Sequence, residues 1–272
     1  MNPLRFGLYA AGIHAPGLDT LAALRLATRE GVPAETLAPA ALPAPAGLPA
    51  NERRRASQAV RLVLACVERA LVDSPFAADE LRVVCATDEG TGEVCLQMLE
   101  SLATNRQVSP LAFPNSVQNA PSGNLSIAHG NREPGSVVSF GLESFASGLL
   151  CAVVDATADR RPVMLVSYDP AMPQPLAELL PVTRPTACAW ILAADGVAGK
   201  AAPLARFELA LADPAAAPAS PLPAWLPAHW AAHSSARAIA ALGLLEAPAT
   251  ARMHLPLGGR TLVLKRVAGV GA

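Results

Sequence analysis

The sequence is poor in charged and aromatic residues and has no excess of either sign of charge. Charged residues make up 16% of the 272 residues, aromatic residues 4%, and the formal net charge is −1. A nearly neutral chain creates little long-range attraction for polyanions, so a general nucleic-acid binder and a protein held to an anionic membrane surface are excluded. Because 52% of the residues are hydrophobic, disorder over most of the chain is excluded as well.

Cysteine is scarce, and no Cys-x-x-Cys pair occurs, so neither a disulfide framework nor a zinc knuckle is indicated. The five cysteines are Cys66, Cys85, Cys95, Cys151 and Cys188. No charged-then-apolar leader opens the chain, and no uninterrupted apolar run reaches the roughly 18 residues that span a bilayer. We therefore expect a reduced, soluble, cytoplasmic protein with no transmembrane segment, no metal and no cofactor.

Proline, in contrast, is abundant, with 26 residues. Residues 33–49 and 213–227 each contain five of them. Each proline removes a backbone donor, so neither segment can form a regular helix or a central strand. Both are expected to be loops or linkers that divide the chain into a short N-terminal unit, a long middle and a C-terminal remnant.

Apolar runs typical of strands alternate with segments at helical spacing, which predicts an α/β protein with a buried sheet. In segment 51–73, Asn51 is expected to be the N-cap, and Arg53, Arg54 and Arg55 to lie in the first turn. The β-branched run 136–140 is expected to be buried on both faces, in the middle of the sheet. The expected strands are 5–13, 81–86, 136–140, 161–168, 186–193, 207–211, 253–255 and 261–266, and the expected helices are 18–30, 51–73, 93–102, part of 116–129, 144–156 and 225–245.

The segment 136–156 is the most informative for chemistry. A strand runs into a turn that contains Gly141 and then into a helix of small residues, which is the geometry of a nucleophile elbow. A side chain at such a turn lies beside a helix N-terminus that favours an anion. The turn reads Gly-Leu142-Glu143-Ser144, without a cysteine, and Cys151 further along the helix is expected to be buried packing.

The chain resembles the β-ketoacyl synthases of the thiolase superfamily in residues 119–134. Asn119-Ala-Pro-Ser-Gly-Asn-Leu-Ser-Ile-Ala-His-Gly130 is similar to their Asn-Met-x-x-Gly-x-x-Ser-Ile-x-x-Gly segment, and Gly-Asn-Arg-Glu-Pro134 to the Gly-Leu-Arg-Gly-Pro that follows. Residues 255–265 look like a degenerate Gly-Phe-Gly-Gly loop and last strand. The resemblance implies a thiolase-like layered α/β/α/β/α fold, and it places the active-site cysteine of the family on Leu142, or on Glu143 after a one-residue slip.

Departures from the family pattern carry a further implication. Neither of the two histidine motifs of complete synthases, His-Gly-Thr and Gly-His, is present. We therefore expect one synthase-like domain over 1–272, with an N-terminal half (1–212), a proline-rich connection (213–227) and a reduced C-terminal half (228–272). Such a chain resembles a chain-length factor, the inactive subunit that pairs with an active ketosynthase, in the short form found in aryl-polyene biosynthesis.

The resemblance also assigns roles to individual residues. It implies a heterodimer that extends an acyl chain on an acyl carrier protein, with a tunnel and interface segment at Phe113, Val117, Gln118 and Asn119. The arginine run 53–55 is either a solvated helix end or a contact for an anionic partner such as the carrier protein.

Three other patterns have simpler interpretations. His229 and His233 could share a helix face, but no third metal ligand is evident. Residues 88–92 lack the lysine of a phosphate-binding loop and are expected to form a turn. An independent acyltransferase or hydrolase that uses Ser144 stays open as the alternative function, although a serine at a helix start is more often a cap.

Overall fold

The computed structural model describes residues 3–32, 41–199 and 201–268. Residues 33–40 of the first proline-rich segment lie outside the described residues. The strands are β1 (Leu4–His14), β2 (Arg82–Ala86), β3 (Gly135–Val138), β4 (Val163–Asp169), β5 (Thr186–Ala193), β6 (Ala205–Ala212), β7 (Arg252–Leu257) and β8 (Arg260–Val267). The α-helices are α1 (Leu21–Glu30), α2 (Ala50–Arg55), α3 (Gln58–Val72), α4 (Gly92–Asn105), α5 (Ala120–His129), α6 (Ser144–Ala158) and α7 (Ser234–Leu242), and short 3₁₀ helices are η2 (Ala78–Glu80), η3 (Phe113–Asn115), η4 (Leu176–Glu178), η5 (Ala228–Ala232) and η6 (Gly243–Glu246).

All eight strands join one sheet in the order β3-β2-β4-β5-β1-β6-β8-β7. Strand β2 pairs in parallel with β3 and β4, and every other neighbouring pair is antiparallel. The predicted α/β class with a shortened C-terminal part is confirmed, but the described residues form three layers, α/β/α, and not all five layers of the predicted α/β/α/β/α fold. After residue 212, the described chain adds only α7, short 3₁₀ turns and the β7–β8 hairpin, which extends the same sheet, so the described residues hold no second, separate sheet layer.

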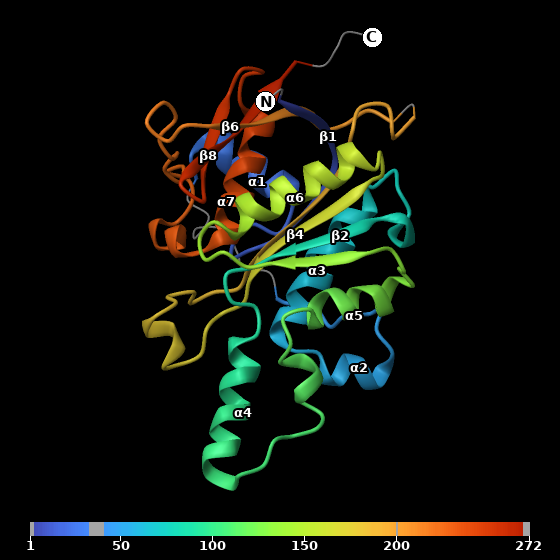
Figure 1. Ribbon diagram of the computed structural model, residues 1–272, viewed down its shortest axis with the longest axis vertical. Helices are drawn as coiled ribbons and strands as arrows, with labels where there is room; N and C mark the ends of the chain where they lie inside the picture. The colour runs from blue at the N-terminus through green and yellow to red at the C-terminus, as the bar shows by residue number, and fades with distance from the viewer. Residues whose placement is uncertain (1–2, 33–40, 200, 269–272) are drawn as a thin grey trace.

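Helices cover both faces of the sheet (Figure 1). On one face, α1, α6 and α7 bury a core that includes Phe145, Trp190 and Phe207. On the other face, α3 and α5 pack on strand residues such as Val166 and Ile191. Burying each such large apolar side chain contributes about 1.5–3 kcal/mol. Helix α4 and the segment after it project away from this body (Figure 1).

The predicted helix 51–73 is wrong in its continuity, because the chain forms two helices. Ala56 and Ser57 leave the helical conformation, and the Ser57 hydroxyl accepts a hydrogen bond from the Val60 N–H, so α3 begins there. Asn51 is not the N-cap of α2, a position held by Pro49, and the three arginines lie in the last turn of that helix. The arginine run therefore lies at a break between two helices.

The predicted burial of the strand 136–140 in mid-sheet is also wrong. Strand β3 covers 135–138 and is an edge strand, with Gly135 and Ser136 exposed and Val137 and Val138 half-buried. Apolar character alone does not separate a strand buried by its own chain from a strand that a second chain covers. The β3 edge therefore offers unpaired backbone groups.

The remaining predicted elements agree with the structure apart from their ends. The predicted helix 18–30 begins only at Leu21, after the Thr20 cap. The predicted helix 225–245 is divided into η5, α7 and η6, and the second proline-rich segment, 213–227, contains no helix or strand, as expected. Residues 141–158, which contain α6, are long and apolar enough to cross a membrane by composition, with a mean hydropathy of 1.2, yet half of them are buried inside the fold, as in a core helix.

Candidate functional site

The turn between β3 and α6, residues 139–143, has the shape of the predicted elbow. Gly141 has a φ of +56°, a conformation that L side chains rarely adopt, so glycine permits the sharp turn. The Ser139 hydroxyl donates a hydrogen bond to the Asp88 carbonyl at 2.6 Å, which ties the turn to the end of β2. Helix α6 then begins at Ser144.

Apolar side chains occupy the exposed part of the elbow. Leu142 is 42% exposed and Phe140 is 66% exposed. Neither side chain has an atom that can attack a thioester or carry a proton. The position that the family resemblance assigns to the active-site cysteine is therefore a surface leucine.

Glu143, the other position considered for the cysteine, is bonded to the C-terminal hairpin. Its Oε2 accepts a hydrogen bond from the Gly258 N–H at 2.7 Å. Gly258 and Gly259 form the tight β7–β8 turn with positive φ values of 54° and 74°. The structure thus brings together the elbow and the degenerate glycine loop, which the sequence shows only as separate segments.

Ser144 closes the turn instead of facing a substrate. It is fully buried, and its hydroxyl donates to the Gly141 carbonyl at 2.7 Å and accepts from the Phe140 N–H at 2.8 Å. A catalytic serine needs a base within hydrogen-bond reach of its hydroxyl. The partners of Ser144 are backbone groups, so the geometry does not favour the hydrolase alternative.

A backbone N–H in the first turn of α6 is hydrogen-bonded within the chain. The Phe145 N–H donates to the Ser234 hydroxyl on α7 at 2.8 Å, in a buried contact between residues 89 positions apart. Enzymes that transfer acyl groups keep such N–H groups free for an oxyanion. Here the Ser234 hydroxyl supplies the oxygen atom that accepts from the Phe145 N–H.

Sequence reasoning missed a buried polar network behind the elbow. Both the N–H and the hydroxyl of Ser235 donate to Asp169 Oδ2 at 2.7 Å, while Asp169 Oδ1 accepts from the Asp88 N–H at 3.1 Å. Thr186 Oγ1 lies 2.7 Å from the Ser235 hydroxyl and 3.1 Å from His233 Nδ1. Burial raises the pKa of Asp169 and lowers the pKa of His233 to about 4. No spacing in the sequence indicates these contacts, because they join four separate elements.

The predicted tunnel and interface residues lie together in the projecting part of the molecule. Phe113 begins η3 and is 58% exposed, and Val117 is 43% exposed. Gln118 and Asn119 are exposed just before α5. Val117 and Asn119 also line a cavity of about 370 Å³ beside α2 and α5. Phe113 is thus not a core residue of this chain.

The three arginines of α2 have different surroundings. The Arg53 guanidinium donates to the carbonyl groups of Ala46 and Leu48, and the Arg54 guanidinium donates to Asn51 Oδ1. The Arg55 guanidinium has no hydrogen bond or ion pair with the described part of the chain, and it borders two cavities. Of the three, Arg55 has the greatest capacity to bind something else.

Residues 88–91, His233 and Cys151 were the other candidates from the sequence. Residues 88–91 form bends before α4, as expected of a turn. His233 is buried and stacks on Trp230, and no cluster of three or more metal-ligating side chains occurs among the described residues. Cys151 is exposed, so its predicted burial is wrong. It lies with Val154 on a face of α6 that the described chain does not cover.

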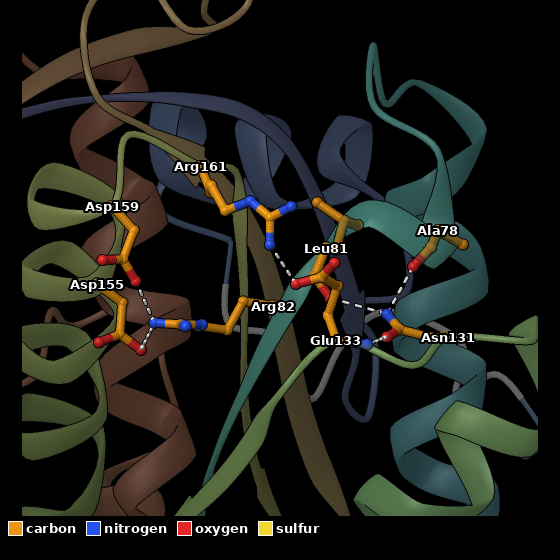
Figure 2. Close-up of polar contacts among 8 residues, drawn as sticks. All are labelled: Ala78, Leu81, Arg82, Asn131, Glu133, Asp155, Asp159 and Arg161. Atoms are coloured by element: carbon orange, nitrogen blue, oxygen red, sulfur yellow. Dashed lines mark hydrogen bonds and ion pairs between the residues drawn. The ribbon is translucent and has the colours of Figure 1, made fainter.

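A polar cluster anchors the opposite end of β3 and α6 (Figure 2). Arg82 at the start of β2 pairs with Asp155 and Asp159 near the end of α6, at 3.6 and 2.6 Å. Arg161 pairs with Glu133 just before β3. The Asn131 side-chain amide donates to the carbonyl groups of Ala78 and Leu81 at 2.7 and 2.8 Å. These contacts hold the loops around β3 in place, so its free edge is a fixed feature.

Known proteins share this fold. The family model of the β-ketoacyl synthase N-terminal domain matches residues 27–239. A structure described as the ketosynthase ApeO in complex with its chain length factor ApeC from Xenorhabdus doucetiae superposes with a TM-score of 0.71 at 23% identity, over 97% of this chain and 100% of that chain. The ishigamide ketosynthase/chain length factor superposes with a TM-score of 0.68 at 18% identity, over 98% and 100% of the two chains.

A further solved structure contains a type II polyketide acyl-carrier protein with its ketosynthase, AntDE:AntF, and superposes with a TM-score of 0.74 at 10% identity, over 97% and 99% of the chains. At these identities the likeness concerns the fold. No curated protein sequence matches this chain. Since the family model covers far more than half of the residues, the chain belongs to the β-ketoacyl synthase N-terminal domain family.

Proposed function

We propose that the chain is a non-catalytic chain-length-factor subunit, which pairs with an active ketosynthase and shapes the acyl tunnel while a polyene or fatty-acyl chain grows on an acyl carrier protein. The observation that carries the proposal is the closed elbow. It presents Leu142 in place of a nucleophile, the Phe145 N–H is bonded to Ser234, and Glu143 is bonded to the Gly258 N–H of the β7–β8 turn. The similarity in fold to ketosynthase/chain length factor structures supports it.

The proposal extends to the whole chain and its setting. Residues 1–272 act as one domain, with the remnant after residue 227 retained because α7 and the β7–β8 turn close the elbow. The short form points to an aryl-polyene pathway in the cytoplasm. The likeness to the ApeO–ApeC complex supports this choice of pathway.

The surface of the chain supports pairing with a second protein. Exposed large apolar side chains occur at Leu99 and Leu102 on α4, in the segment after it, at Ile127 on α5 and at the elbow. Monomeric soluble proteins rarely expose apolar side chains over a large continuous area. The free β3 edge lies next to the elbow, so a strand of the partner can extend the sheet there.

Within this heterodimer, the segment that contains Phe113, Val117, Gln118 and Asn119 crosses to the partner and lines its tunnel. The exposure of Phe113 and Val117 supports this role, since their own chain leaves them uncovered. A growing chain stops where a bulky side chain fills the channel. The arginines 53–55 face the carrier protein, whose acidic surface their charge complements.

Co-expression tests the pairing. The chain is produced alone and together with a candidate partner ketosynthase from the same organism, and both preparations are compared by gel filtration and native mass spectrometry. We expect a stable one-to-one heterodimer from co-expression and an aggregation-prone chain without the partner, because the apolar surface is then uncovered. A soluble monomer that forms no complex with the ketosynthase would contradict the proposal.

A further inference from the structure

The two edge strands of the sheet, β3 and β7, have different surroundings. Strand β7 runs beside the cover segment, residues 217–226 of the second proline-rich stretch, which contains no strand. The Ser220 N–H donates to the His254 carbonyl at 2.9 Å, and the His254 N–H donates to the Ser220 hydroxyl at 2.9 Å. The Pro218 carbonyl lies 3.1 Å from His254 Nδ1. Both outward backbone groups of His254 are therefore hydrogen-bonded within the chain.

The alternation along β7 shows which of its other residues point outward. Backbone groups of alternate residues point to the same side of a strand, so Arg252 and Pro256 share the outward side of His254. Pro256 has no N–H to donate, and Arg252 is charged and exposed. Proline, a charged side chain and a covering loop are three ways in which proteins protect an edge strand from further pairing. The outer edge of β7 has all three.

The cover segment is fixed to the fold on both sides of Ser220. Before it, the Ala217 carbonyl accepts a hydrogen bond from the Thr261 hydroxyl of β8 at 2.8 Å. After it, Trp225 and Leu226 are buried in the core between the sheet and α7. The segment therefore lies along β7 as a packed part of the domain.

The composition of the cover segment prevents it from acting as a new edge. A chain segment that covers a strand offers its own outer backbone groups to the next strand. Three of the six residues 218–223 are prolines, which lack the N–H, and the Ser220 N–H is already bonded to His254. Few donors of the cover segment are left for a further strand.

We infer that the cover segment keeps β7 from pairing with another chain, so that assembly through the sheet is limited to the free β3 edge. Without it, the β3 edge of one copy could pair with the β7 edge of the next, a head-to-tail contact that grows into open filaments. In the proposed heterodimer the partner covers β3, and two uncovered β7 edges would join heterodimers into larger assemblies. The inference goes beyond the proposed function and depends on it only for the partner at β3.

Hydrogen exchange and native mass spectrometry of the co-expressed heterodimer test the inference. Ser220→Pro removes both groups that bond to His254, so we expect the His254 amide to exchange about tenfold faster. Adding Pro256→Val gives β7 a further outward donor. In this double variant we expect the one-to-one complex to shift to a two-to-two or larger complex as the concentration rises. Ala219→Pro is the matched control, since it places the same ring at the neighbouring exposed position and leaves Ser220 unchanged.

Each other outcome decides against the inference. A double variant that stays one-to-one although the His254 amide exchanges fast would overturn it, because the opened edge then pairs with nothing. Unchanged exchange in folded Ser220→Pro, or larger complexes formed equally by Ala219→Pro, would overturn it too. If circular dichroism shows that Ser220→Pro does not fold, Ser220→Ala with Pro256→Val is measured instead, since it removes only the hydroxyl acceptor.

Failure of the proposed function is visible separately. If the unchanged chain forms no heterodimer, the proposed pairing is wrong, and the same variants are compared in the chain alone. Larger assemblies of the double variant than of Ala219→Pro still support the inference there, and equal assemblies overturn it.

Discussion

Individual side-chain oxygens decide the chemistry of the elbow. Glu143 accepts a hydrogen bond from the Gly258 N–H of the β7–β8 turn, and Ser234 accepts one from the Phe145 N–H in the first turn of α6. Ser144 satisfies two backbone groups of the elbow turn. An acyl-transferring enzyme keeps backbone N–H groups beside its nucleophile free for the oxyanion, whereas the Phe145 N–H is bonded to Ser234. The proposed lack of catalysis therefore depends on several residues and not only on the missing cysteine.

The account assigns Ser144 a structural role, which can be measured as stability. Ser144→Ala removes the acceptor for the Phe140 N–H and the donor to the Gly141 carbonyl. We expect the free energy of unfolding to fall by about 1–3 kcal/mol, because two hydrogen bonds with a typical net value of about 1 kcal/mol each are lost. Urea denaturation of the heterodimer gives this value. An unchanged stability together with a loss of acyl transfer would restore Ser144 as a nucleophile.

Two buried histidines predict how stability depends on pH. Burial lowers the pKa of His233 to about 4, with His229 nearby adding to the effect, and burial followed by the charge of Arg69 lowers the pKa of His14 to about 4. In the unfolded chain a histidine has a pKa of about 6.5. Between these values the unfolded state binds protons that the native state does not, so the free energy of unfolding falls as the pH falls from about 6.5 to 4.

Urea titrations between about pH 6.5 and 4 measure how steeply the free energy of unfolding depends on pH. His233→Gln should make the free energy of unfolding less dependent on pH, because one histidine with a lowered pKa no longer titrates. His14 and His129, whose pKa values burial also lowers, should contribute to the dependence that remains. A stability curve that is flat in this window, or one that rises toward acid, would show that the histidines are not buried in their neutral form.

At the scale of elements, the sequence predicts what local patterning determines. Apolar periodicity and β-branched runs identify the strands and most helices, since burial on a sheet or along a helix stripe follows from spacing. The break between α2 and α3 is missed because the Ser57 cap competes with a continuous helical pattern. Spacing also shows no reason for Ser234 to bond to the Phe145 N–H, because only the folded sheet brings α7 to α6.

The two largest errors of the sequence-based prediction concern burial. A single sequence does not show whether an apolar surface is covered by its own chain or by a second protein. Strand β3 and Cys151 were expected to be buried, yet β3 is an edge strand and Cys151 is exposed. Their apolar surroundings require cover, and the described chain does not provide it. In the proposed heterodimer the partner covers both, so these errors indicate where to look for the interface.

The β3 edge supplies a backbone test of this interface. Pro134 and Val138 accept hydrogen bonds from Val83 and Thr87, so even-numbered positions of β3 face β2 and the Val137 N–H points to the free edge. Val137→Pro removes that outward donor and leaves the hydrogen bonds to β2 in place, although it also shortens a half-buried side chain that packs on the core. We expect it to weaken the heterodimer while the chain stays folded, as judged by native mass spectrometry and circular dichroism.

Ser136→Pro is the matched control, because position 136 faces β2 and a proline there disturbs the sheet itself. We expect it to reduce the stability of the chain. Should Val137→Pro leave the heterodimer as tight as before, the partner does not pair with this edge.

At the scale of the whole molecule, the projecting segment should set product length. Phe113→Ala removes a large exposed side chain, and products should lengthen by about one two-carbon unit or more, since packed channels respond to single methylenes. Val117→Trp should shorten or block the product by overpacking. Each variant is co-expressed with the ketosynthase and carrier protein, and the products are sized by mass spectrometry. Stable heterodimers that yield unchanged lengths would remove both residues from the tunnel.

The most direct test of the central claim is a reconstituted condensation with intact-mass analysis of both subunits. The heterodimer is assayed with acyl and malonyl carrier proteins, first with the native ketosynthase and then with its active-site cysteine replaced by alanine. We predict product and an acyl adduct on the ketosynthase in the first case, and in the second no product and no adduct on this chain, because Leu142 and Glu143 cannot hold a thioester. An acyl adduct on this chain, on Ser144 above all, or condensation by the cysteine-free heterodimer, would contradict the account.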